Sequence, residues 1–261
     1  MEQEPVLLER NGHIATIRLN RPEEMNAFNY AALEKLGEIT EQLQLESKDI
    51  RVVIVAAEGR AFCAGADLKE RRTLNEQQTR RNVRKIRDVF TAIERLPQPT
   101  IAAINGYAFG GGFELALACD FRYAVQGALM GLTEVSLGII PGAGGTQRLS
   151  RLVGPSKAKE LILTARKITA QAALEFGVLN GIAESQEQLM DQATTLANEI
   201  LANAPLAVYQ AKYAIDKGSS VDLQTGLDLE SKAYEVIIPT KDRLEALNAF
   251  REKRKPVFRG E

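Results

Sequence analysis

The sequence predicts an α/β protein whose last part is entirely helical. Short β-branched strand patterns alternate with helical patterns through about the first two-thirds of the 261 residues, which is typical of mostly parallel βα units. Beyond that region the apolar residues recur at helical spacing alone. We therefore expect a core over residues 1–195, which carries the functional site, and a separate helical region over residues 196–261.

The mixed part is expected to begin with a β-hairpin. Residues 6–9 and 14–19 alternate apolar and polar side chains around an Asn11-Gly12 turn. Further along, helical spacing predicts helices over 31–45 and 72–96, and short buried apolar runs predict strands over 52–56, 100–104 and 121–125. The helix over 72–96 would bury an apolar stripe of Val83, Ile86, Val89, Phe90 and Ile93.

The remaining elements are predicted to be helices. Their expected ranges are 156–164, 170–176, 188–201, 205–217 and 241–252. Pro205 suits a first helical turn, and Gly218 suits a helix end. The helix from Gln188 carries an apolar stripe of Leu189, Ala193, Leu196 and Ile200, which must be buried against either the main domain or a neighbouring subunit. The family resemblance described below favours the neighbour.

Composition places the chain among ordinary globular proteins. Hydrophobic residues make up 45%, charged residues 26%, and the formal net charge is -1, so no overall field favours nucleic acid or a membrane surface. No apolar run approaches the roughly 18 residues that span a bilayer. Cys63, Cys119 and the single histidine, His13, lack metal-site spacing. We expect a cytoplasmic protein with reduced thiols and no metal.

Three segments carry the candidate chemistry. Residues 62–69 (FCAGADLK) follow a buried strand and are mostly small, which lets a ligand approach the main chain. Residues 105–114 (NGYAFGGGFE) run from a strand through three glycines into a helix, whose first N–H groups attract negative charge. Residues 134–148 place Glu134 ahead of a second Gly-rich turn and helix. Their order along the chain is the informative feature.

Taken singly, each segment has a simpler interpretation. A run of glycines after a strand most often forms a tight turn. The triple glycine is followed by no GK[ST], so it does not match a phosphate-binding P-loop, and it does not match the dinucleotide motif GxGxxG. An isolated glutamate near a helix start usually complements the helix dipole at the surface. Only the ordered combination favours a functional site.

That combination closely resembles the enoyl-CoA hydratase (crotonase) superfamily. The resemblance covers essentially the whole chain, from Arg21-Pro22 and Asn26-Ala27 to residues 250–254 (FREKR). The segments FCAGADLKER, FELALACD and IPTKDRLEALNAFREKR are most similar to short-chain enoyl-CoA hydratases and to the AU-rich-RNA-binding methylglutaconyl-CoA hydratases. The resemblance implies a crotonase-type spiral of repeated ββα units, a C-terminal helical trimerisation region, and a hexamer built as a dimer of trimers.

The resemblance also implies the site residues. Glu114 and Glu134 would be the two catalytic acids, with Glu114 the base for water and Glu134 the proton donor to carbon. The backbone N–H groups of Ala66 and Gly111 would form the oxyanion hole, where negative charge develops on the thioester oxygen. The substrate and its coenzyme A moiety would contact Ala64, Ala66, Asp67, Leu68, Lys69, Gly111 and Gly142. Coenzyme A is part of the substrate, so no separate cofactor is implied.

The function implied is addition of water across the 2,3 double bond of a trans-2-enoyl-CoA, in fatty-acid or branched-chain amino-acid degradation. Many relatives lose one or both acids and catalyse other reactions, so the presence of both glutamates favours a hydratase. The same scaffold could instead isomerise the double bond. Crotonyl-CoA and methylglutaconyl-CoA both remain open as substrates, and the second, with its extra carboxylate, would require a cation near the acyl end.

Charged segments leave two further alternatives. The basic stretch Arg71, Arg72, Arg80, Arg81, Arg84, Lys85 and Arg87 is most simply a solvated helix face. Lys253, Arg254 and Lys255 resemble a tail that reaches coenzyme A in a neighbouring subunit, and a plain exposed cluster is the alternative. RNA binding through residues 33–51 is disfavoured, since that segment is acidic on balance and phosphate binding requires cations.

Overall fold

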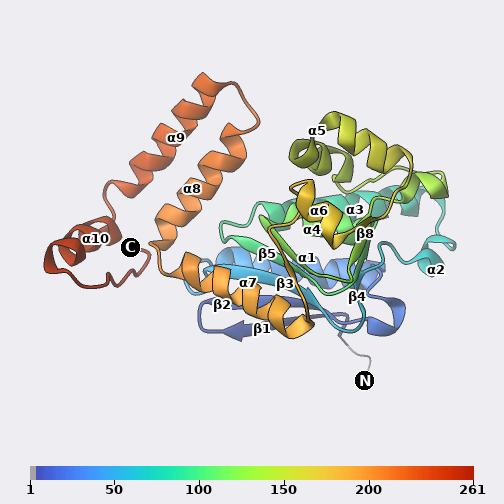
Figure 1. Cartoon of the computed structure of the whole chain (residues 1–261), viewed down its shortest axis with the longest axis horizontal. Helices are drawn as coiled ribbons and strands as arrows, with labels where there is room; N and C mark the ends of the chain where they lie inside the picture. Colours follow the sequence, from blue (N-terminus) through green and yellow to red (C-terminus); the bar gives the residue numbers. More distant parts are fainter. Residues whose placement is uncertain (1–3) are drawn as a thin grey trace.

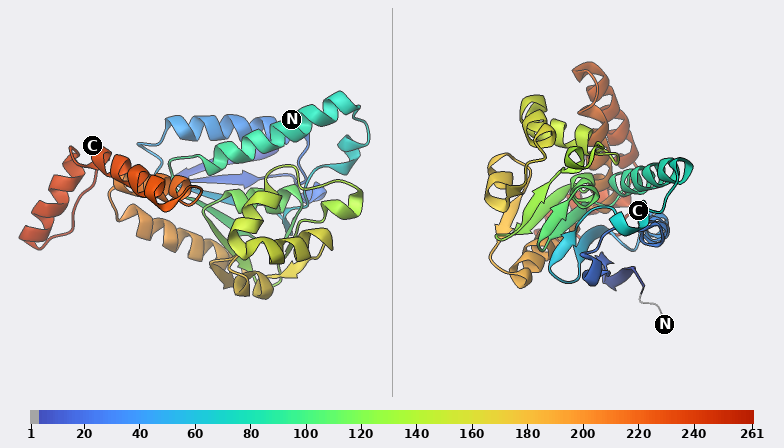
Figure 2. Two further views of the ribbon diagram at one scale, coloured as in Figure 1. Left: turned by 90° about the horizontal axis from the view of Figure 1, so that it is seen from above. Right: turned by 90° about the vertical axis from the view of Figure 1, so that its right-hand side faces the viewer.

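The computed structural model describes residues 4–261, which form an α/β body with a helical extension (Figure 1). The body contains two sheets and the helices that cover them. The extension consists of α8 (Pro205–Gly218), α9 (Leu223–Ile237) and α10 (Lys241–Glu252). In the left view of Figure 2 it projects from one end of the body. The predicted α/β class with a helical last part is confirmed.

The larger sheet has the strand order β1-β2-β3-β5-β7-β10. Its strands are β1 (Val6–Asn11), β2 (Ile14–Leu19), β3 (Val52–Ala57), β5 (Thr100–Ile104), β7 (Phe121–Val125) and β10 (Gly181–Ala183). β1 and β2 form the predicted antiparallel hairpin, with Asn11 paired to Ile14, and the other neighbours run parallel. β3 and β5 are buried throughout, as their uninterrupted apolar runs require.

The smaller sheet has the order β4-β6-β8-β9. Its strands are β4 (Ala61–Cys63), β6 (Tyr107–Phe109), β8 (Leu129–Gly131) and β9 (Ile168–Thr169). Strands β4, β6 and β8 run parallel, and β9 is antiparallel to β8. None of these strands was predicted, because two or three residues are too few to show a periodicity.

The chain passes repeatedly from the larger sheet to the smaller sheet and then into helices. β3 and β4 lead to α2 (Leu68–Arg71) and α3 (Glu76–Glu94), β5 and β6 to α4 (Gly111–Ala118), and β7 and β8 to the 3-10 helix η2 (Glu134–Leu137) and α5 (Gly145–Leu163). These are the repeated ββα units that the resemblance implied. Since β4, β6 and β8 are parallel neighbours, their carboxyl ends meet at one edge, and the three motif segments that follow them converge there.

The other helices differ from their predictions in detail. α1 spans Tyr30–Leu45, α6 spans Ala170–Glu175 and a short 3-10 helix, η1, spans Pro22–Glu24. The helix predicted over 72–96 is α3, which begins only at Glu76, because Asn75 caps its start in a capping box with Gln78. α5 is interrupted at Gly154, where φ is +78° ahead of Pro155.

The helix α7 (Gln186–Leu201) belongs to the body rather than to the extension. Its buried residues Leu189, Ala193 and Ala197 pack against the larger sheet, on Ile54 and Ile101 among others. The main domain, and not a neighbouring subunit, therefore buries the stripe that we had assigned to the neighbour. The boundary expected between residues 195 and 196 falls inside α7, and the packing changes after Leu201 instead.

The extension is joined to the body by few polar contacts. Lys212 of α8 donates to Asp120 Oδ2 at 2.6 Å, and the Tyr209 hydroxyl donates to the Ser47 carbonyl at 2.8 Å. α9 was not predicted at all, although Asp222 caps it with a bond from the Thr225 N–H. Most of its side chains are exposed in this single chain, but Leu223, Leu227, Tyr234 and Ile237 recur at helical spacing along the side that lines the groove beside α8, so the pattern was present in the sequence and was missed.

Candidate active site

Glu114 lies at the convergent edge of the smaller sheet, in the first turn of α4. The chain leaves β6, turns at Gly110 with φ +50°, and begins the helix at Gly111. Only 3% of Glu114 is exposed, yet its Oε1 accepts N–H groups from Ala143 and Gly145, both at 2.8 Å. Burial raises the pKa of Glu114, while these two hydrogen bonds oppose the rise by stabilising the ionised form.

Glu134 begins the 3-10 helix η2, just after β8. It is 8% exposed, and its Oε2 is buried with no hydrogen-bond partner among residues 4–261. Burial, and secondarily the charge of Glu114, raises the pKa of Glu134 to about 7. Its Oε1 lies 3.3 Å from the position that a Cβ at Gly110 would occupy, so a side chain there would press on the carboxyl. Glu134 can therefore hold a proton near neutral pH.

Two backbone N–H groups lie close together beside these acids. A Cβ built on Gly111 would lie 3.9 Å from the Ala66 nitrogen, and one built on Gly65 would lie 3.5 Å from the Gly111 nitrogen. Gly65 has φ +102°, a conformation that other residues rarely adopt. The loop after β4 and the start of α4 thus approach each other main chain to main chain, and the expected pair of donors from Ala66 and Gly111 is adjacent in space.

Gly112 permits this close approach. A Cβ at Gly112 would lie 2.2 Å from the Cys63 carbonyl oxygen and 2.7 Å from the Cys63 Cβ. α4 therefore packs directly on β4 with no room for any side chain. The thiol of Cys63 is fully buried, and burial raises its pKa to about 12, so this cysteine packs and does not react.

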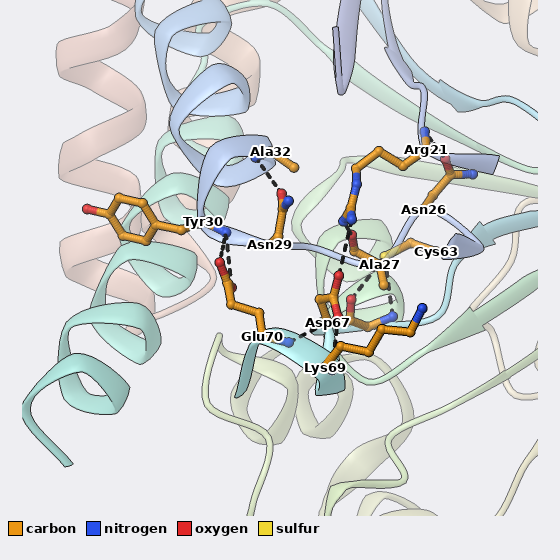
Figure 3. A network of polar contacts seen from close by, with 11 residues as sticks. Arg21, Asn26, Ala27, Asn29, Tyr30, Ala32, Cys63, Asp67, Lys69 and Glu70 are labelled. Atoms are coloured by element: carbon orange, nitrogen blue, oxygen red, sulfur yellow. Dashed lines mark hydrogen bonds and ion pairs between the residues drawn. The ribbon is translucent and has the colours of Figure 1, made fainter. Parts of the chain in front are cut away.

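A polar network between Arg21 and Asp67 anchors the loop after β4 (Figure 3). Asp67 accepts the Arg21 guanidinium at 3.1 Å and the N–H groups of Lys69 and Glu70, while Arg21 also donates to the Ala27 carbonyl. Burial alone would raise the pKa of Asp67, but these donors outweigh it and the pKa is lowered. The carboxylate at Asp67 is therefore a structural anchor for residues 64–70 as well as a predicted ligand contact.

A second anchor holds the Gly-rich turn that contacts Glu114. Arg148 donates to both oxygens of Glu94, at 2.8 and 2.7 Å, and to the Ala143 carbonyl at 2.7 Å. The Ala143 N–H is thereby directed at Glu114. Gly142 lies against Val83 of α3, since a Cβ there would be 3.2 Å from that side chain. Residues from four separate segments thus surround the two acids.

Comparisons with known proteins decide the family. The model of the enoyl-CoA hydratase/isomerase family matches residues 9–261. The chain belongs to this family.

Relatives and solved structures agree over nearly the whole length. A putative enoyl-CoA hydratase/isomerase of Bacillus subtilis is 52% identical over 96% of both chains, and a short-chain-enoyl-CoA hydratase of Clostridium acetobutylicum is 43% identical over 98% of this chain and 97% of the other. The human mitochondrial methylglutaconyl-CoA hydratase is 45% identical, over 98% of this chain and 76% of its own. The crystal structure of an enoyl-CoA hydratase from Bacillus anthracis has a TM-score of 0.95 and 51% identity, covering 98% and 100% of the two chains.

Membership in the enoyl-CoA hydratase/isomerase family agrees with where the structure places the predicted residues. Glu114, Glu134, Ala66 and Gly111 meet at one edge, and Ala64, Asp67, Leu68 and Lys69 lie on the loop and short helix beside them. Sequence reasoning missed Ala143 and Gly145, the backbone donors to Glu114, and Arg148 behind them. Their only signal was the glycine run at 142–145, from which we had singled out Gly142.

Within residues 4–261, no group of three or more His, Cys, Asp or Glu side chains is placed to hold a metal ion. No helix in the described part of the chain is both long and apolar enough to cross a membrane.

Proposed function

We propose that this enoyl-CoA hydratase/isomerase family member is a hydratase, which adds water across the 2,3 double bond of a trans-2-enoyl-CoA to give a 3-hydroxyacyl-CoA. One observation carries the proposal. Two buried carboxyls, Glu114 and Glu134, lie beside two adjacent backbone N–H groups, and the charge of Glu114 contributes to the raised pKa of Glu134. Hydration requires a base for water, an acid for carbon and donors for the thioester oxygen, and these groups supply all three.

The surroundings of the two acids favour different roles. Two N–H groups at 2.8 Å favour the carboxylate form of Glu114, which suits a base that takes a proton from water. Glu134, whose pKa is raised to about 7 and whose Oε2 has no hydrogen-bond partner in the described chain, suits a proton donor to the α-carbon. This division is the one that the family resemblance implied.

The thioester oxygen would accept the N–H groups of Ala66 and Gly111. Gly111 is also the first residue of α4, so the positive end of the helix dipole points at the same oxygen. A donor of this kind contributes about 3–4 kcal/mol to a transition state of this type. Coenzyme A would lie along Ala64, Leu68 and Lys69, with the acyl chain directed toward the two acids.

Hydration of crotonyl-CoA tests this function. The enone absorbance should fall, and mass spectrometry should find 3-hydroxybutyryl-CoA as the product. A family member that only moves the double bond would give an isomeric thioester of unchanged mass. Substrate preference and pathway, whether fatty-acid or branched-chain amino-acid degradation, belong to the same proposal, and the relatives named for short-chain and for methylglutaconyl substrates support both options.

We also propose that the extension assembles the protein into trimers, paired as hexamers. Large apolar side chains are exposed along α8, α9 and α10: Ile215, Leu223, Leu227, Tyr234, Leu244, Leu247 and Phe250. A groove of about 550 Å³ lies between α8 and α9, lined largely by alanine, leucine and isoleucine. Exposed surface of this kind is typical of an interface. Light scattering at micromolar concentration tests the proposal.

The remaining charged segments contribute less to the proposal. Arg254 pairs with Glu245 and Glu252 of its own chain, which leaves Lys253 and Lys255 as the cations able to reach coenzyme A in a neighbour. RNA binding is further disfavoured, because Lys35 pairs with Glu4 in this chain. A cytoplasmic location stays a prediction, since relatives with mitochondrial names are among the matches.

A further inference from the structure

A buried arginine of β7, Arg122, lies at the C-terminal end of α4. Only 5% of Arg122 is exposed. Its guanidinium donates to four main-chain carbonyls, those of Ala116, Cys119, Asp120 and Val178. Ala116 is in the last turn of α4, and Cys119 is the residue that ends the helix. Arg122 therefore caps the helix whose opposite end lies at the active site.

The guanidinium of Arg122 has carbonyl partners but no carboxylate partner within residues 4–261. The adjacent acid, Asp120, is paired elsewhere. Its Oδ2 accepts Lys212 Nζ at 2.6 Å, and also the N–H and the hydroxyl of Thr100 at 2.7 and 3.0 Å. Burial lowers the pKa of Arg122, yet a guanidinium keeps its proton in proteins. A net positive charge is therefore fixed at this end of α4.

A cation at the C-terminal end of α4 strengthens the electrostatic field at its N-terminal end. A helix carries roughly half a positive charge at its first turn and half a negative charge at its last turn. In α4, with eight residues and a length of about 12 Å, the two ends partly cancel. Arg122 offsets the negative end, which leaves the positive end at Gly111 less opposed. Since all of α4 is buried, water and salt screen this effect little.

We infer that Arg122 is a positioning residue that acts on the reaction through α4. Its fixed charge increases the polarisation of a thioester carbonyl bound at the Gly111 N–H, and it stabilises the negative charge that develops on that oxygen. Arg122 does not touch the substrate, because the length of α4 separates the two. The inference rests on the proposed function, in which the Ala66 and Gly111 N–H groups bind the thioester oxygen.

The test measures carbonyl polarisation directly, with butyryl-CoA labelled with carbon-13 at its thioester carbonyl. This saturated thioester has no double bond to hydrate, and its carbonyl stretch moves to lower frequency as the carbonyl is polarised. Isotope-edited infrared difference spectra record that stretch for the bound molecule. On the wild-type protein the stretch should fall when butyryl-CoA binds, and steady-state kinetics with crotonyl-CoA supply kcat and KM in parallel.

Two replacements of Arg122 separate charge from hydrogen bonding. Arg122→Gln keeps hydrogen-bond donors without the charge, so it should reverse part of the fall in frequency and lower kcat about 5- to 10-fold, with little change in KM. Arg122→Lys keeps the charge and should retain most of the fall and most of kcat. Arg18→Gln is the matched control, since Arg18 belongs to the same sheet but pairs with Glu9 and Glu58 rather than with α4. It should leave the stretch and kcat unchanged.

Asp120→Asn tests the direction of the effect with a nearly isosteric change. It removes a negative charge from the end of α4 that Arg122 caps, so the stretch of bound butyryl-CoA should move to a still lower frequency. Disturbed packing around Arg122 would instead leave the polarisation unchanged or reduce it. This variant therefore decides the inference even if Arg122→Gln fails to fold.

Equal losses of polarisation in Arg122→Gln and Arg122→Lys would assign Arg122 to structure alone and overturn the inference, as would an unchanged or reduced polarisation in Asp120→Asn. The same measurements separate this inference from the proposed function. If the wild-type protein lowers the stretch and the variants do not alter it, only the inference fails. If the polarisation follows the charge at Arg122 but crotonyl-CoA gives no hydrated product, the hydratase proposal fails while the inference stands. If binding to the wild type leaves the stretch unchanged, the proposed oxyanion hole fails, and the inference fails with it.

Discussion

Glu114 Oε1 and the backbone N–H of Gly145 are 2.8 Å apart, across 31 positions of the sequence. This bond links the helix that follows β6 to the turn that precedes α5. It leaves Gly145 no room for a side chain, because a Cβ there would be 3.0 Å from the same Oε1. The glycine-rich turn is therefore fitted closely to the Glu114 carboxyl, and the bond favours the ionised form of that group.

Replacing either acid by its amide should abolish most activity with little effect on folding. Glu114→Gln and Glu134→Gln should each lower the hydration rate of crotonyl-CoA by at least about 100-fold, the scale of one positioned acid or base. In the Glu114→Gln variant the amide oxygen can still accept the two backbone N–H groups, so unfolding by urea should change little. Near-normal turnover by either variant, with the expected product, would refute the two-carboxyl mechanism.

Glu134 should make stability depend on pH in a defined direction. Its folded pKa of about 7 exceeds the ordinary value of 4.5, so the folded state binds more protons between these values. The free energy of unfolding should therefore fall as pH rises from 4.5 to 7, by about 1–2 kcal/mol after discounting for solvent screening. Urea unfolding of the wild type and of Glu134→Gln at pH 5 and pH 8 measures the difference. If the two proteins show the same pH dependence, Glu134 is not protonated as described.

Gly112 should tolerate no side chain. Gly112→Ala would place a Cβ 2.2 Å from the Cys63 carbonyl, which forces α4 away from β4 and separates the paired N–H groups. We expect a loss of roughly 2–4 kcal/mol in stability and a large fall in kcat, because overpacking between backbones cannot relax. Gly127→Ala is the matched control, since nothing lies within 4 Å of a Cβ at that turn. Equal stability of the two variants, measured by thermal unfolding, would show that α4 has room to move.

The apolar groove between α8 and α9 should be required for assembly. Leu227→Glu puts a charge into the groove and should convert the oligomer into smaller species, seen by light scattering. Leu45→Glu offers a matched control, because Leu45 is 87% exposed at the end of α1, outside the extension. A wild-type protein that is already a stable, fully active monomer would contradict the assembly proposal directly.

The local sequence determined those elements whose own residues carry the pattern. β5, β7 and α10 have the predicted bounds, since each shows its full periodicity or apolar run within one segment. The motif residues from 62 to 69, 105 to 114 and 134 to 148 were recognised as a set, and the family they indicated is confirmed. Their joint role could be predicted because the order of the three motifs can be recognised from the sequence alone.

The tertiary structure alone decided which groups meet. Glu114 and Glu134 come together because β6 and β8 are adjacent parallel strands, and short strands of the smaller sheet leave no periodic signal. The stripe on α7 is buried by its own sheet, since the same apolar spacing suits either a sheet or a partner subunit.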